Sequence, residues 1–87
     1  MTKLEQKLIE LGYKKEFEFG GKFIYFSKRK WRFVEIGILI NKELNKIDSY
    51  RVDMDDRKIT YYKEVDEINE AFNEMQKDLE ELKSCQN

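Results

Sequence analysis

The 87-residue chain contains no histidine and no proline, and its only cysteine is Cys85. Without histidine there is no imidazole base for nucleophilic catalysis, and one cysteine cannot supply the ligands of a zinc site. A single cysteine also cannot form a disulfide within the chain, so nothing requires an oxidising compartment. The pair Gly20-Gly21 is not followed by the Lys-Ser pair and the helix of a phosphate-binding loop. The sequence therefore predicts no catalytic residue, no metal site and no cofactor, and hence a protein that is not an enzyme.

Long apolar runs are missing as well. The most apolar stretch, VEIGILI at residues 34–40, is much too short to span a bilayer and includes a glutamate. The opening sequence MTKLEQKLIELGY alternates charges where a signal peptide would have an apolar centre. We therefore expect no membrane contact and a cytoplasmic location.

What the chain does have is a balance of apolar and charged residues, at 40% each, with 14% aromatic residues. This composition is too apolar for intrinsic disorder, and the length suits one core. The sequence predicts a single domain over residues 1–87. It begins with a helix at 3–11, since Thr2 and Glu5 have capping-box spacing and leucines recur at helical intervals up to Gly12.

Alternating patterns predict strands after this helix, at about residues 15–19, 22–27, 31–40, 47–54 and 58–63. The Gly-Gly pair joins the first two in a hairpin whose register the sequence leaves open. A two-residue loop would place Phe17 and Phe19 on one face with Ile24 and Phe26. A three-residue loop with a bulge would instead pair Phe19 with Phe23 and Phe17 with Tyr25.

The third strand is expected to begin after a polar turn at Lys28-Arg29-Lys30. Alternation then predicts that one row of this strand faces the helices, namely Arg32, Val34, Ile36, Ile38 and Ile40. The opposite row comprises Trp31, Phe33, Glu35, Gly37 and Leu39. If it is exposed, its aromatic residues form a candidate binding surface or a homodimer contact.

A long helix is predicted over residues 65–84, because apolar residues form a stripe at helical spacing: Ile68, Ala71, Phe72, Met75, Leu79 and Leu82. The predicted fold class is α+β, with an N-terminal helix, an antiparallel meander of four or five strands and a long C-terminal helix. Both helices are expected on one face of the sheet.

Charge is distributed unevenly and suggests two competing binding surfaces. The first is a basic-aromatic hairpin at residues 22–33, which could bind nucleic acid through Lys28, Arg29, Lys30, Trp31 and Arg32. The pI of about 5.6 argues against that reading. The second, which we favour, is the acidic face of the last helix, where a protein partner would contact Glu67, Glu70, Glu74, Asp78 and Glu81.

Residues with AT-rich codons are abundant, and the segments LEQKLIELGY and INEAFNEMQKDLEELK open and close a compact chain. In these respects the sequence resembles small phage and prophage proteins of low-GC Gram-positive bacteria. The resemblance implies an accessory protein that binds a host protein stoichiometrically. The group of proteins that the sequence resembles includes inhibitors of CRISPR-Cas nucleases. Such inhibitors often use acidic surfaces to occupy basic nucleic-acid channels.

Overall fold

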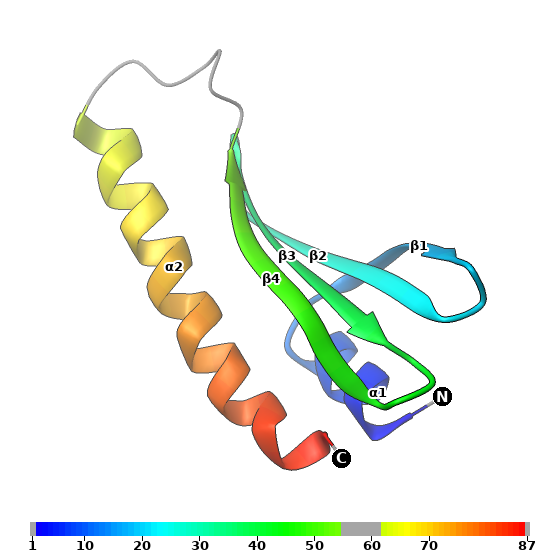
Figure 1. Ribbon diagram of the computed structural model, residues 1–87. Helices are drawn as coiled ribbons and strands as arrows, with labels where there is room; N and C mark the ends of the chain where they lie inside the picture. The colour runs from blue at the N-terminus through cyan, green and yellow to red at the C-terminus, as the bar shows by residue number, and fades with distance from the viewer. Residues whose placement is uncertain (1, 55–61, 87) are drawn as a thin grey trace.

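The computed structural model describes residues 2–54 and 62–86. In these residues the chain forms helices and strands in the following order: α1 (Lys3–Glu10), β1 (Lys14–Phe19), β2 (Phe23–Trp31), β3 (Val34–Asn41), β4 (Lys46–Met54), α2 (Tyr62–Leu82) and the short 3-10 helix η2 (Lys83–Cys85). Figure 1 shows α2 running along the sheet, with α1 near its C-terminal end. The chain is an α+β fold, as the sequence predicts.

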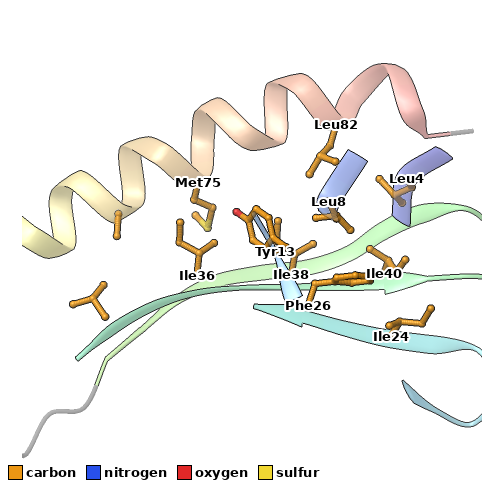
Figure 2. Packing of buried hydrophobic residues seen from close by; sticks show 12 residues of the cluster. Leu4, Leu8, Tyr13, Ile24, Phe26, Ile36, Ile38, Ile40, Met75 and Leu82 are labelled. Carbon is orange, nitrogen blue, oxygen red and sulfur yellow. The ribbon is translucent and has the colours of Figure 1, made fainter. Parts of the chain in front are cut away.

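The four strands form one antiparallel sheet in the order β1-β2-β3-β4. Sequential neighbours pair throughout, which is the meander expected from strands joined by short turns. Both helices contribute buried side chains to a core on one face of the sheet, as Figure 2 shows for Leu8 of α1 and Met75 of α2. The other face is left open by the helices.

The first helix starts where its cap predicts and ends at Glu10, one residue before the predicted end. The Thr2 hydroxyl accepts a hydrogen bond from the Glu5 amide at 3.1 Å and so satisfies one of the free N–H groups of the first turn. Leu4 and Leu8 are fully buried against the sheet. Gly12 then takes a φ of +97°, a conformation that side chains disfavour, and turns the chain into β1.

The hairpin adopts the second of the two predicted registers. Phe19 pairs with Phe23 and Phe17 with Tyr25, around a three-residue loop at residues 20–22 and with a register shift at Glu16. Both glycines of the loop have positive φ, near +60°. This register turns the phenylalanines of β1 away from the helices, so they do not join Ile24 and Phe26 in the core.

The predicted turn at residues 28–30 is wrong. Lys28, Arg29 and Lys30 lie within β2, which continues to Trp31, and the chain turns at residues 32–33 instead. The third strand accordingly begins at Val34 rather than at residue 31, and Arg32 belongs to the turn. Ion pairs between this end of β2 and α2, described below, explain why a run of basic residues is held in a strand.

The predictions near the C-terminus are met in part. Helix α2 begins at Tyr62, so the last two residues of the strand predicted at 58–63 are helical, and residues 58–61 lie outside the described part of the chain. The helix ends at Leu82 and is followed by η2.

The apolar stripe of α2 packs on the sheet with one exception. Ala71, Met75 and Leu82 are buried, and Ile68 and Leu79 are partly buried against them. Phe72 is 48% exposed, on the edge of the stripe. The isoleucine row of β3 fills the other side of this core as predicted (Figure 2). Within the described residues, neither helix has the length and apolar character needed to cross a membrane.

Candidate functional site

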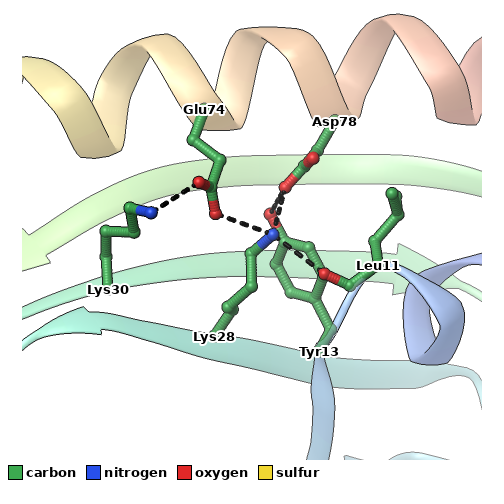
Figure 3. Close-up of polar contacts among 6 residues, drawn as sticks. All are labelled: Leu11, Tyr13, Lys28, Lys30, Glu74 and Asp78. Atoms are coloured by element: carbon green, nitrogen blue, oxygen red, sulfur yellow. Dashed lines mark hydrogen bonds and ion pairs between the residues drawn. The ribbon is translucent and has the colours of Figure 1, made fainter.

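The two charged surfaces expected from the sequence meet where β2 contacts α2. The Lys28 Nζ lies 2.7 Å from the Asp78 Oδ2 and 2.9 Å from the Glu74 Oε2, which joins β2 to α2. The Glu74 Oε1 lies 2.7 Å from the Nζ of Lys30. Tyr13 donates a 2.8 Å hydrogen bond from its hydroxyl to Asp78. These five residues, drawn in Figure 3, are referred to below as the Lys28 cluster.

The Lys28 ammonium has its full set of partners. It donates to the Leu11 carbonyl oxygen at 2.9 Å, in addition to the two carboxylates, and it lies 4.6 Å from the centre of the Tyr13 ring. Three acceptors match the three N–H bonds of an ammonium group. Asp78 is only 4% exposed, so its charge is taken from water and compensated by Lys28 and Tyr13. The Lys28 cluster therefore holds β2, α2 and the segment after α1 together.

The cluster also shifts the titration of its members. The hydrogen bond from Lys30 holds the pKa of the Glu74 carboxyl below its ordinary value, and Lys28 adds to this effect. The same hydrogen bond raises the pKa of Lys30. Burial raises the pKa of the Tyr13 hydroxyl, and its hydrogen bond to Asp78 adds to the shift. Each shift favours the protonation state present at neutral pH.

This arrangement divides the acidic face expected on α2. Glu74 and Asp78 point toward β2 and are engaged there, whereas Glu70 and Glu81 are exposed and Glu67 is half-buried. The basic-aromatic hairpin is divided as well. Lys28 and Lys30 face α2, while Arg29 is opposite Glu35 on the other face of the sheet. Neither predicted surface is presented as one continuous patch.

Trp31 departs from its predicted face. A register shift at Lys30 places Trp31 opposite Val34, whose side chain is buried under the helices. Residues opposite one another in an antiparallel pair share a face, so Trp31 lies on the helix side, at the margin of the core. Arg29 donates to the Arg32 carbonyl oxygen at 2.8 Å, and the Arg32 guanidinium lies 5.2 Å from the centre of the Phe33 ring in the exposed turn.

The open face of the sheet carries a different aromatic group. The rings of Phe17 and Tyr25 stack with their centres 5.1 Å apart, and those of Phe19 and Phe23 stack at 5.5 Å. The two pairs adjoin through Phe17 and Phe19, whose ring centres are 5.7 Å apart. Phe17 is 52% and Phe19 46% exposed. Together with Leu39, these four aromatic residues are called the open aromatic face below.

A glycine on the neighbouring strand lets one of these rings lie against the sheet. A Cβ added at Gly37 would be 2.8 Å from the Cζ of Tyr25 and closer still to its hydroxyl oxygen. The Arg51 guanidinium lies 5.5 Å from the centre of the same ring and 3.5 Å from its hydroxyl oxygen. These side chains and Leu39 border a shallow depression of about 390 Å³. None of the described residues that line it is acidic.

Clusters of possible metal ligands are not found in the part of the chain that the structure describes. No group of three or more Cys, Asp or Glu side chains there is placed to hold a metal ion. No protein-family model matches the chain, and neither a curated protein nor a solved structure is similar to it at a significant level. What the protein does must therefore be inferred from its own surfaces.

Sequence reasoning missed two features of these surfaces. It assigned no role to Tyr13. This residue directly follows Gly12, which ends α1, and its hydroxyl donates to Asp78 of α2. It placed the exposed aromatic residues on the predicted strand 31–40, as Trp31 and Phe33, whereas the open aromatic face is formed mainly by β1 and β2. The signal was present in KEFEF, whose two phenylalanines alternate with charges. Only the hairpin register decides which way they point.

Proposed function

We propose that this is a non-enzymatic accessory protein that acts by stoichiometric binding to another protein. The observation that carries the proposal is the open aromatic face, which exposes Phe17 and Phe19 beside the half-buried Tyr25 on the side of the sheet without helices. Contiguous aromatic side chains exposed on a small protein mark a site where a partner buries them. The resemblance described above implies a host protein in the cytoplasm, with a CRISPR-Cas nuclease or similar defence factor as the specific candidate.

The chemistry of the face indicates what the partner presents. The rim of the depression carries the cation Arg51, whose side chain is largely exposed. A complementary surface therefore offers apolar side chains to the rings and brings no second cation to Arg51. The rings cover one another's faces, at angles of 21° for Phe17–Tyr25 and 27° for Phe19–Phe23. Stacking covers one face of each ring and so reduces the ring surface available to nucleic-acid bases, which favours a protein partner over a nucleic acid.

The Lys28 cluster reduces the charge that the two surfaces predicted from the sequence have available for binding a partner. Occupation of a basic channel by α2 would depend on Glu67, Glu70 and Glu81, because Glu74 and Asp78 are already paired. Nucleic-acid binding by residues 22–33 would depend on Arg29 and Arg32, because Lys28 and Lys30 are paired in the same cluster. Each surface retains only part of its charge.

The test uses matched variants of the full chain in affinity capture from a low-GC Gram-positive host lysate. Phe17→Ser with Phe19→Ser removes the exposed rings from the open aromatic face. Ile9→Ser is the control, because Ile9 is similarly exposed but lies on α1. Glu70→Lys with Glu81→Lys tests the acidic face. We expect one protein captured at equal stoichiometry by the wild type, by Ile9→Ser and by the lysine variant, and lost from the double serine variant.

Two results would contradict this proposal. Loss of the captured protein from the lysine variant, with the double serine variant unaffected, would assign binding to α2. Binding of single- or double-stranded oligonucleotides that weakens steeply with added salt would assign the protein to nucleic-acid recognition.

A further inference from the structure

The exposed edge of the sheet at β4 is a second surface, which adjoins the depression of the open aromatic face at Arg51. The strand order makes β4 an edge strand, and Figure 1 shows it beside α2. The C-terminal segment covers its first part. Gln86 Oε1 accepts a 2.7 Å hydrogen bond from the Ile47 amide, and Cys85 O accepts one from the Asn45 side chain at 2.9 Å. Residues 50–54 lie beyond this cover.

The side chains of residues 50–54 are unusual for an edge strand that does not pair with a further strand. Tyr50 is 53% and Met54 40% exposed, both on the helix side of the sheet, opposite Ile38 and Val34. Arg51 and Asp53 lie on the other side, opposite Gly37 and Glu35, and form a 3.5 Å ion pair with each other. Exposed edge strands with large apolar side chains are templates for pairing with another strand.

We propose that β4 pairs antiparallel with β4 of a second copy of this chain, about a two-fold axis at Val52. In that register Arg51 of each copy lies opposite Asp53 of the other, and Tyr50 lies opposite Met54. Opposite charges and apolar pairs placed directly across an antiparallel strand pair are stabilising. Moving the axis to Arg51 would place the two arginines against each other. The strand is thus self-complementary about Val52, as a two-fold interface requires.

Helix α2 supports the same partner through the composition of its side facing β4. Gln76 and Leu79 border the space above Ile47 and Tyr50, which identifies that side. Phe72 is one turn from Gln76 on the same side, since residues four apart lie above one another in a helix. The neighbouring positions Asn69 and Asn73 are uncharged, in a helix whose other exposed positions are mostly acidic.

In the paired sheet the two copies of α2 lie on the same face, next to each other. A two-fold axis perpendicular to the sheet keeps the helix side of both copies on one side. The exposed Phe72 rings and the uncharged amides of Asn69, Asn73 and Gln76 then approach, while Glu70 and Glu81 point elsewhere. Glu80 on this side is paired with Lys83 at 3.3 Å. The α2 helices of the two copies can therefore lie next to each other with little repulsion between like charges.

The first test exchanges charge across the pair. By light scattering on size-exclusion chromatography and by sedimentation over a range of concentrations, we expect the wild type to form a dimer of the 10.6 kDa chain. Arg51→Asp and Asp53→Arg each place like charges opposite one another and should weaken the dimer at least about tenfold. An equimolar mixture of the two variants restores opposite charges at both positions and should form a heterodimer. Arg32→Asp, a reversal in the exposed turn, is the control and stays dimeric.

The second test reads the register. Residues directly opposite in an antiparallel pair have Cα atoms about 4.5–5.5 Å apart, within the range that a disulfide spans. In a Cys85→Ser background, Val52→Cys should form a disulfide-linked dimer on mild oxidation. Tyr50→Cys should not, because its two copies would be separated by roughly 13 Å along the strands. A wild type that is monomeric at every concentration would overturn the proposal. So would a dimer indifferent to both charge reversals, or cross-linking by Tyr50→Cys but not by Val52→Cys.

Discussion

Lys28 Nζ lies 2.7 Å from Asp78 Oδ2, although the two residues are fifty positions apart in the sequence. This contact converts two charge runs that look like separate surfaces into one internal connection between the sheet and α2. A local excess of charge in a sequence is a surface only if the folded chain does not bring its complement alongside.

Removal of Lys28 should destabilise the protein strongly. Lys28→Met leaves Asp78 buried with only the Tyr13 hydroxyl for compensation, and breaking a buried pair in this way costs roughly 3 kcal/mol of unfolding free energy. Lys30→Met is the control, because Lys30 is twice as exposed and should cost about 1 kcal/mol or less. Urea unfolding of both variants measures the difference. Equal losses would show that Lys28 contributes no more than a surface ion pair.

Acid should weaken the fold through Glu74. Its lowered pKa means that the native state resists protonation more than the unfolded chain does, so this contribution is complete above the ordinary value of 4.5. It is lost as the pH falls below that value and through the lowered pKa. We expect the urea midpoint to fall between pH 6 and about pH 3. In Glu74→Gln the fall should be shallower, and an unchanged slope would contradict the assignment.

Alkali should weaken the fold through Tyr13. Its pKa is raised in the native state, so the neutral hydroxyl stabilises the fold below the ordinary value of 10.0, and this contribution is lost as the pH rises above it. Lys30, with a raised pKa, acts in the same direction above 10.5. Thermal melts between pH 8 and about pH 11 should show the loss, and Tyr13→Phe should reduce it. A variant as sensitive to alkali as the wild type would exclude Tyr13 as the cause.

Gly37→Ala should disturb the open aromatic face. The new methyl group would overlap the Tyr25 ring, and overpacking of this kind costs about 1–3 kcal/mol. The cost should nearly disappear in a Tyr25→Ala background, where the space is free. A double-mutant cycle by urea unfolding measures this coupling. Equal costs in both backgrounds would show that the backbone, and not the ring, requires glycine.

Phe17→Ala should leave the fold largely intact. Phe17 is half exposed and its main contact is the stacked pair with Tyr25, so about 1 kcal/mol is expected. Phe26→Ala, a fully buried residue of the next strand, should cost about 3–5 kcal/mol. The contrast, measured by chemical unfolding, establishes that changes on the open aromatic face report on binding. A cost for Phe17→Ala as large as that for Phe26→Ala would show that the face belongs to the core.

The sequence was sufficient for the fold class because each element has a local signal. Period-two alternation, the Thr2 cap and the apolar stripe of α2 act over a few residues and agree with one another. Strand boundaries failed at Lys28 and Lys30, whose strand conformation depends on Glu74 and Asp78 in α2. No local pattern near residue 28 contains that information.

The candidate surfaces were harder to predict for the same reason. A one-residue change of register moves Phe17 and Phe19 between core and solvent, and the Gly-Gly loop permits both registers. The shift at Lys30 likewise moves Trp31 to the helix side. Two irregular positions in the strand pairing therefore decide which side chains form the candidate binding surfaces. Periodicity alone does not reveal these positions.

The position of Asp78 also affects how the chain folds as it is synthesised. The four strands pair between sequence neighbours and emerge first, whereas the carboxylates that satisfy Lys28 come from the last part of the chain. Until they appear, the nascent sheet has an uncovered row of isoleucines and an ammonium group without its anions. We therefore expect that a form with the sheet paired and α2 undocked would be the one most open to chaperones and proteases.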